Sequence, residues 1–196
     1  MTEVLTPTTE LEAVNTMLSM IGEMPVNSVD TSSLTEASIA AQTLYSVSRQ
    51  VQSEGLNCNT EYDYPMVPDG SKQIAVPEDV ISIDATDRTK DIIAREGYLY
   101  NRTDHTKQFN GTVMCDIVWL LKFEDLPEHV RQFIMIRAGR IFQKKMVGSK
   151  LLFELTQEEE AQARANMRSR EVENEDHNML TGFLARQGSI RRGSVW

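Results

Sequence analysis

The stretch FEDLPEHVRQFIMIRAGRIFQKKMVG, residues 123–148, decides the fold. Pro127 suits the first turn of a helix, because its missing N–H would have no partner there. Gly148 is a typical left-handed stop. Acidic residues near the start and lysines near the end match the helix dipole. The stretch predicts one helix from Phe123 to Gly148.

Apolar residues recur along this helix at three- and four-residue spacings, which marks a buried face. The stripe comprises Val130, Phe133, Ile134, Ala138 and Ile141, with Arg137 and Lys145 in register and Ile136 and Phe142 widening it. A helix this apolar needs several partners, and the rest of the chain is interpreted as supplying them.

Two helices are predicted upstream. Thr9 and Glu12 form a capping box ahead of the apolar face Leu11, Val14, Leu18 and Ile21. Ser33 and Glu36 repeat that signature and predict a second helix to about Glu54, ended by Gly55. Its buried stripe is predicted to be Ala37, Ala41, Leu44, Val47 or Ser48, and Val51.

A fourth helix is predicted from Lys150 to Glu173. Its apolar face is thin: Leu151, Leu152, Leu155, Ala161, Ala163 and Ala165. Glu160 and Arg164 have the spacing of a favourable pair within one helix. This helix is expected to be half exposed, or sandwiched between copies of the chain.

Short segments punctuated by prolines lie between the second and third helices, and four of them are predicted as strands. They are Lys72–Val76, Val80–Ala85, Gly97–Tyr100 and Thr112–Phe123. Residues 101–111 form a polar loop. The predicted fold is therefore α+β: a four-helix antiparallel bundle, an inserted small antiparallel β-region and an extended C-terminal arm. The segments are 1–56 and 124–176 for the bundle, 57–123 for the β-region and 177–196 for the arm.

The net charge of −9 argues against broad binding to nucleic acid, which needs basic surface. Two cysteines, Cys58 and Cys115, suggest a reducing compartment and free thiols. No apolar run is long enough to span a membrane. The polar, acidic N-terminus is not expected to be a secretion signal.

The tail, residues 177–196, has no Asp or Glu and three arginines, so residues 1–176 carry 17 basic and 29 acidic groups, a net −12. Its apolar residues are separated by glycines. The composition favours an arm that orders on a partner. Its arginines could bind DNA phosphates, but an acidic protein surface is the preferred interpretation.

No catalytic or cofactor motif is present, and neither a metal nor a cofactor is expected. His105, His129 and His177 are interpreted as surface residues. Glu61 with Asp63 could be imagined as a glycosidase pair, although such spacing is common on exposed strands. Tyr98 and Tyr100 could form a stacking platform, but packing on one strand face is the preferred interpretation.

An ordered set of short stretches resembles the tail tubular protein A family of short-tailed phages. The stretches are 13–15, 21–26, 49–53 before Gly55, 97–103, 126–128, 158–163 and 178–180. They follow the family's order over most of the chain.

The resemblance implies a structural, non-enzymatic virion protein in the tail, which is present in the host cytoplasm during assembly. It implies a homo-oligomeric ring, of twelve copies, between the portal protein and the tail tubular protein B nozzle. Such a ring retains packaged DNA, passes double-stranded DNA without sequence-specific binding and helps seat the tail fibre. No membrane contact is implied.

Two sets of contact residues are predicted. The portal-binding arm comprises Met179, Leu180, Phe183, Leu184, Arg186, Ile190, Arg191, Arg192 and Trp196. The loop that faces the nozzle or fibre comprises Asn101, Arg102, Asp104, His105, Lys107 and Asn110. The alternatives are a glycan hydrolase acting on the host surface and a DNA-binding terminator.

Overall fold

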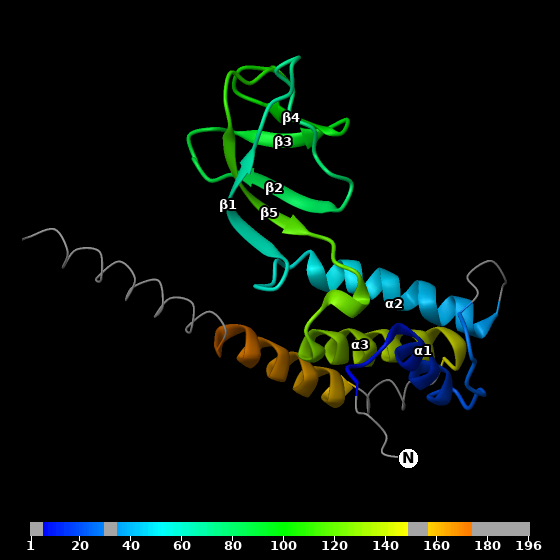
Figure 1. Cartoon of the computed structure of the whole chain (residues 1–196). Helices are drawn as coiled ribbons and strands as arrows, with labels where there is room; N and C mark the ends of the chain where they lie inside the picture. Colours follow the sequence, from blue (N-terminus) through cyan, green and yellow to red (C-terminus); the bar gives the residue numbers. More distant parts are fainter. Residues whose placement is uncertain (1–5, 30–34, 149–156, 174–196) are drawn as a thin grey trace, which may run out of the picture.

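The computed structural model describes residues 6–29, 35–148 and 157–173. Within these ranges the fold is α+β, with the helices gathered on one side and two small antiparallel sheets on the other (Figure 1). The elements are α1 (Glu10–Ser19), α2 (Glu36–Gln52), β1 (Thr60–Met66), β2 (Val80–Ala85), β3 (Ile92–Arg95), β4 (Tyr98–Asn101), β5 (Val113–Trp119), the 3₁₀ turn η1 (Phe123–Asp125) and α3 (Glu128–Met146). Residues 157–173 are also helical.

The stretch 123–148 is not one continuous helix, which corrects the prediction. η1 ends at Leu126, whose backbone is extended (ψ 148°), and α3 begins after Pro127. A residue before proline avoids the helical region, because the proline ring crowds its backbone. Gly148 takes the left-handed conformation expected of a stop (φ +67°).

The ends of the upstream helices are set by local hydrogen bonds. The capping box of Thr9 and Glu12 is confirmed. The predicted cap at Ser33 is wrong: the cap of α2 is Thr35, whose hydroxyl accepts from the Ser38 N–H. The Ser38 hydroxyl in turn accepts from the Thr35 N–H, so a serine takes the place of the glutamate in the usual capping box. α2 ends at Gln52, two residues earlier than expected.

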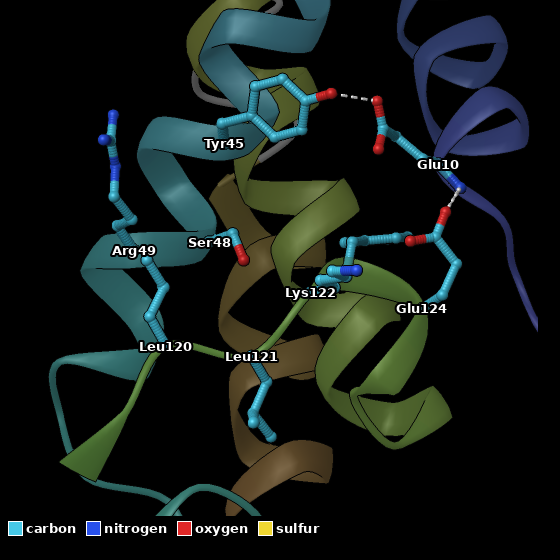
Figure 2. A pocket seen from close by; sticks show the side chains of 9 residues that line it. Glu10, Tyr45, Ser48, Arg49, Leu120, Leu121, Lys122 and Glu124 are labelled. Carbon is cyan, nitrogen blue, oxygen red and sulfur yellow. Dashed lines mark hydrogen bonds between the residues drawn. The ribbon is translucent and has the colours of Figure 1, made fainter. Parts of the chain in front are cut away.

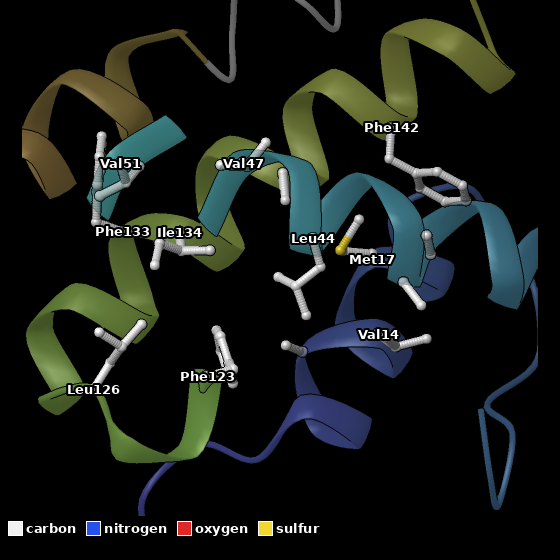
Figure 3. Close-up of a cluster of buried hydrophobic side chains, with 14 of the residues drawn as sticks. Val14, Met17, Leu44, Val47, Val51, Phe123, Leu126, Phe133, Ile134 and Phe142 are labelled. Atoms are coloured by element: carbon white, nitrogen blue, oxygen red, sulfur yellow. The ribbon is translucent and has the colours of Figure 1, made fainter. Parts of the chain in front are cut away.

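One apolar core joins the helices (Figure 3). Its fully buried members include Val14 and Met17 from α1, Leu44 and Val51 from α2, Phe133, Ile134, Ala138 and Phe142 from α3, and Met167 from residues 157–173. Gly139 leaves room for the Met20 side chain at the end of α1, because an added Cβ would lie 2.6 Å from the Met20 sulfur. The predicted stripes of α2 and α3 are largely confirmed, but Ile136 and Ile141 are half-buried.

The strands form a three-stranded sheet in the order β1-β5-β2 and a β3-β4 hairpin. β2 is confirmed as predicted. β4 begins and ends one residue later than predicted, and β5 begins one residue later and ends at Trp119, four residues before the predicted end at Phe123. Lys72–Val76 is not a strand, because only Ala75 forms a bridge, to Tyr98. β1 and β3 escaped prediction. β1 is mostly exposed, so its sequence shows no alternation of apolar and polar residues. Its pairing with β5 is also irregular at Asp63, whose φ is +55°.

Replacing Ile134 with aspartate is expected to unfold the protein. The side chain is fully buried in the helical core, so the variant would place an unpaired charge there and lose the apolar contacts. The expected loss of unfolding free energy is about 4 kcal/mol or more. Thermal melting followed by circular dichroism measures it. Ile136→Asp, on the half-buried side of α3, is the matched control. A soluble Ile134→Asp protein with native helicity would contradict the core assignment.

Candidate functional site

The chain passes from the helices to the sheets after α2 and returns to the helices after β5. A buried glutamine holds these two crossings together. Gln52, the last residue of α2, is fully buried. Its amide oxygen accepts from the Leu121 N–H at 2.7 Å, and its amide nitrogen donates to the Leu121 carbonyl at 3.0 Å. One side chain therefore satisfies both backbone groups of a residue on the return crossing, after β5.

A second buried amide, Asn59, reinforces the same point. Its side-chain nitrogen donates to the carbonyls of Gln52 (3.1 Å) and Trp119 (2.7 Å). Its side-chain oxygen accepts from the Leu56 N–H at 2.8 Å. We call Gln52 and Asn59 the amide junction. Sequence patterns missed it, because a glutamine at a helix end and an asparagine in a turn ordinarily mark solvent-exposed positions.

A groove of about 460 Å³ lies beside the amide junction (Figure 2). We call it the junction groove. Its lining comes from α1, α2 and the return crossing: Glu10, Tyr45, Ser48, Arg49, Leu120, Leu121, Lys122, Phe123 and Glu124. The Tyr45 hydroxyl donates to the Glu10 carboxylate. This hydrogen bond, together with burial and the charge of Glu10, raises the pKa of Tyr45 to about 12.

The segment before α1 is clamped onto the start of α3. Arg131 donates to the backbone carbonyls of Thr8 (2.9 Å) and Leu126 (2.6 Å) and to that of Glu124. Glu128 accepts from the Thr8 N–H and hydroxyl. Partial burial would raise the pKa of Glu128, but hydrogen bonds from Gln132 and Thr8 outweigh it and lower that pKa.

The helix at residues 157–173 docks on α2 and α3 mainly through charged groups. Glu160 is nearly buried and bridges Arg137 (3.3 Å) and Arg140. Arg164 pairs at 3.0 Å with Glu54, two residues beyond the end of α2. The predicted pair between Glu160 and Arg164 is therefore wrong, because Glu160 binds two arginines of α3 and Arg164 binds Glu54.

The inward face of this helix also differs from the prediction, since Ala161 and Ala165 are exposed. Glu171 accepts from the Asn57 N–H (2.7 Å) and lies 3.0 Å from the ring of His129. His129 is thus half-buried rather than an ordinary surface residue. Met167 supplies the deep apolar contact.

The predicted nozzle-facing or fibre-facing loop is well structured. The Asn101 side-chain oxygen accepts from the N–H groups of Thr103 and Asp104, and its nitrogen donates to the Asp104 carboxylate. Arg102 pairs with Asp91 at 3.4 Å. The other predicted loop residues are placed as follows: Lys107 pairs with Glu96, Asn110 accepts from Lys72, and His105 is exposed at φ +54°.

Tyr98 and Tyr100 carry cations over their rings. The Arg95 guanidinium lies 4.1 Å from the Tyr100 ring centre, and the Lys107 amine lies 5.9 Å from that of Tyr98. The β3-β4 hairpin and the loop thus present cations that are held by aromatic rings and carboxylates. The predicted arm residues, Met179 to Trp196, and His177 lie outside the described residues.

Features expected of other protein classes are not found in the part of the chain that the structure describes. Glu61 and Asp63 are exposed on β1, and the Asp63 N–H binds Asp116 at 3.1 Å. Among the described residues, no group of three or more His, Cys, Asp or Glu is placed to hold a metal ion. No helix in the described ranges is both long and apolar enough to cross a membrane. Cys58 and Cys115 are free thiols, as predicted.

Gln52→Leu is expected to weaken the fold at the amide junction. The variant leaves the N–H and carbonyl of Leu121 without their partner, at a cost of about 2 kcal/mol or more. Urea unfolding measures the loss, and hydrogen exchange at the Leu121 amide localises it. Gln42→Leu, at an exposed position of the same helix, is the control. Equal stability of the two variants would contradict the role of the junction.

Cys58 is expected to report the docking of residues 157–173. Burial, with the charge of Glu171, raises the pKa of Cys58 to about 11, so its reactive thiolate is scarce at pH 8 and increases up to about pH 11. Glu160→Gln removes the buried charge between Arg137 and Arg140 and loosens the helix. Thiol labelling of Cys58 at pH 8 should accelerate severalfold.

Two comparisons make this measurement specific. Glu158→Gln, at an exposed position of the same helix, should leave the labelling rate unchanged. Cys115 is fully buried among the strands and should stay slow in every variant. Equal rates for Cys58 in Glu160→Gln and Glu158→Gln would show that the buried ion pairs do not hold the helix.

Comparison with known proteins agrees with the resemblance seen in the sequence. The family model described as tail tubular protein matches residues 11–177. Tail tubular protein A of Klebsiella phage KP34 is 30% identical over 125 residues, which cover 64% of this chain and 66% of the relative. The alignment thus spans just under two thirds of that relative's length. Because the family match covers most of the sequence, the chain belongs to the tail tubular protein family and is a structural protein of the phage tail.

Proposed function

We propose that the chain forms an adaptor ring, of twelve copies, between the portal protein and the tail nozzle. In this role it retains packaged DNA and contributes to the ejection channel. It assembles in the host cytoplasm and remains in the virion tail. The family match over residues 11–177 is the observation that carries the proposal.

The architecture supports a connecting role. Helices and sheets occupy opposite sides of the molecule, so each region can contact a different neighbour (Figure 1). The amide junction joins the crossings rigidly, which would keep those contacts at a fixed spacing. We infer that the helices act as an antiparallel four-helix bundle, with segments 1–56 and 124–176 flanking the β-region of residues 57–123.

The two predicted contact sets are assigned to different neighbours. The arm, residues 177–196, binds the portal through apolar side chains and its arginines. The ordered loop around Asn101 faces the tubular protein B nozzle or the fibre. Its side chains are already held by internal hydrogen bonds and ion pairs, so docking would cost little conformational entropy.

The net charge of −9 suits a channel for DNA. An acidic lumen repels the phosphate backbone, whose charges lie about 1.7 Å apart along the axis, and so discourages sticking during ejection. Sequence-specific binding is not part of the proposal. The competing hydrolase hypothesis gains no support from Glu61 and Asp63, which stand exposed on an edge strand.

Removing residues 177–196 is expected to abolish binding to purified portal rings while leaving the folded region intact. The arm carries three arginines and no acid, so the triple change of Arg186, Arg191 and Arg192 to glutamate should weaken binding at least about tenfold. Size-exclusion chromatography with and without portal measures the complex. A triple change of Arg88, Lys90 and Arg102 to glutamate is the control.

Unchanged portal binding by the truncated chain would overturn the role of the arm. Failure of the full-length chain to bind portal at all would overturn the adaptor function. Release of sugar from capsular or cell-wall glycan by the purified chain would instead favour the hydrolase.

A further inference from the structure

The end of α3 presents apolar side chains beside cations. Met146 is 38% exposed and Val147 is 48% exposed. Lys144 and Lys145 precede them and are also exposed. Single exposed apolar residues are common on soluble proteins, whereas these two lie together at the end of α3. We call residues 144–147 the α3 knob.

The junction groove has the complementary character at one end. Tyr45, Leu121 and Phe123 give it an apolar floor, and the carboxylates of Glu10 and Glu124 stand at the α1 side (Figure 2). Two more exposed acids, Glu12 and Asp125, lie close to these in sequence. Arg49 and Lys122 also line the groove and partly offset this negative charge.

One copy cannot place its own knob in its own groove. The groove includes η1, directly before α3, whereas the knob lies at the far end of that helix. α3 has 19 residues, which at the usual rise separates its ends by about 28 Å. A second copy is therefore needed to join the two surfaces.

We propose that the junction groove of one copy binds the α3 knob of a second copy. The apolar side chains of Met146 and Val147 cover the groove floor, and Lys144 and Lys145 face the carboxylates of Glu10 and Glu124. Such a contact uses two different surfaces, so an open chain of copies keeps one free groove at one end and one free knob at the other until it closes as a ring. The inference rests on the proposed ring function and names the contact that builds it.

Paired charge reversals test the contact. One variant combines Glu124→Lys with Asp125→Lys, which makes the groove basic, and the other combines Lys144→Glu with Lys145→Glu, which makes the knob acidic. Each alone should assemble at least tenfold less well than the unmodified chain, because like charges then meet. An equal mixture should recover assembly, since the basic groove accepts the acidic knob and the native groove accepts the native knob. Mass photometry, with and without portal, counts the copies.

A matched pair of reversals controls for net charge. Arg88→Glu with Lys90→Glu alters two exposed cations between β2 and β3 and should leave assembly unchanged. Circular dichroism melting establishes that each variant is folded. Assembly of either single variant like the unmodified chain would overturn the proposal, and so would failure of the mixture to recover.

A cross-linking measurement keeps the native charges and covers the case of a misfolded variant. Tyr45→Cys protein mixed with Met146→Cys protein should form a disulfide between copies under mild oxidation. Replacing Met146→Cys with Arg88→Cys should reduce that product to background; equal yields would overturn the contact. If the unmodified chain assembles on portal while these tests fail, the inference falls and the ring function stands. If it never assembles, both fall.

Discussion

The buried amide of Gln52 is the constraint on which the two-region architecture depends. A single peptide crossing would leave the sheets free to swing relative to the helices. Here one side chain at the end of α2 binds both backbone groups of Leu121, 69 residues later, and Asn59 adds a bond to Trp119. Because these groups are removed from water, breaking any of them leaves an unpaired polar group. The junction therefore fixes the position of the sheets as well as joining them to the helices.

The junction also places the groove. Leu120 to Glu124 leave β5 at the point that Gln52 holds, and they run past α2 before α3 begins. The apolar floor and the acidic rim of the groove are thus consequences of the same crossing. A neighbour that docked there would contact a segment whose backbone the buried amides hold.

Residues 157–173 are held by a different combination of apolar and charged contacts. Met167 enters the core and Ala163 packs against it, while Glu160 joins two arginines of α3. Such pairs gain less net free energy than apolar burial, because both ions lose water. An ion pair forms only when its two charged groups lie at the right distance and orientation. These pairs therefore favour one position of the helix against α3 and the end of α2. The helical region thus combines an apolar core of α1, α2 and α3 with a fourth element positioned by charge.

The sequence by itself determined the features whose partners lie within a few residues. The capping box of Thr9, the apolar stripe of α3 and the glycine stop at Gly148 follow from helical periodicity and local hydrogen bonds. The ordered short stretches also identified the family. The tertiary structure alone decided which distant groups meet. The Gln52 side chain hydrogen-bonds to the Leu121 backbone, and Glu160 pairs with Arg137 rather than with Arg164. Gly139 leaves room for the Met20 side chain. No local pattern encodes these choices, since a polar side chain shows the same spacing whether its partner is water or a buried group far along the chain.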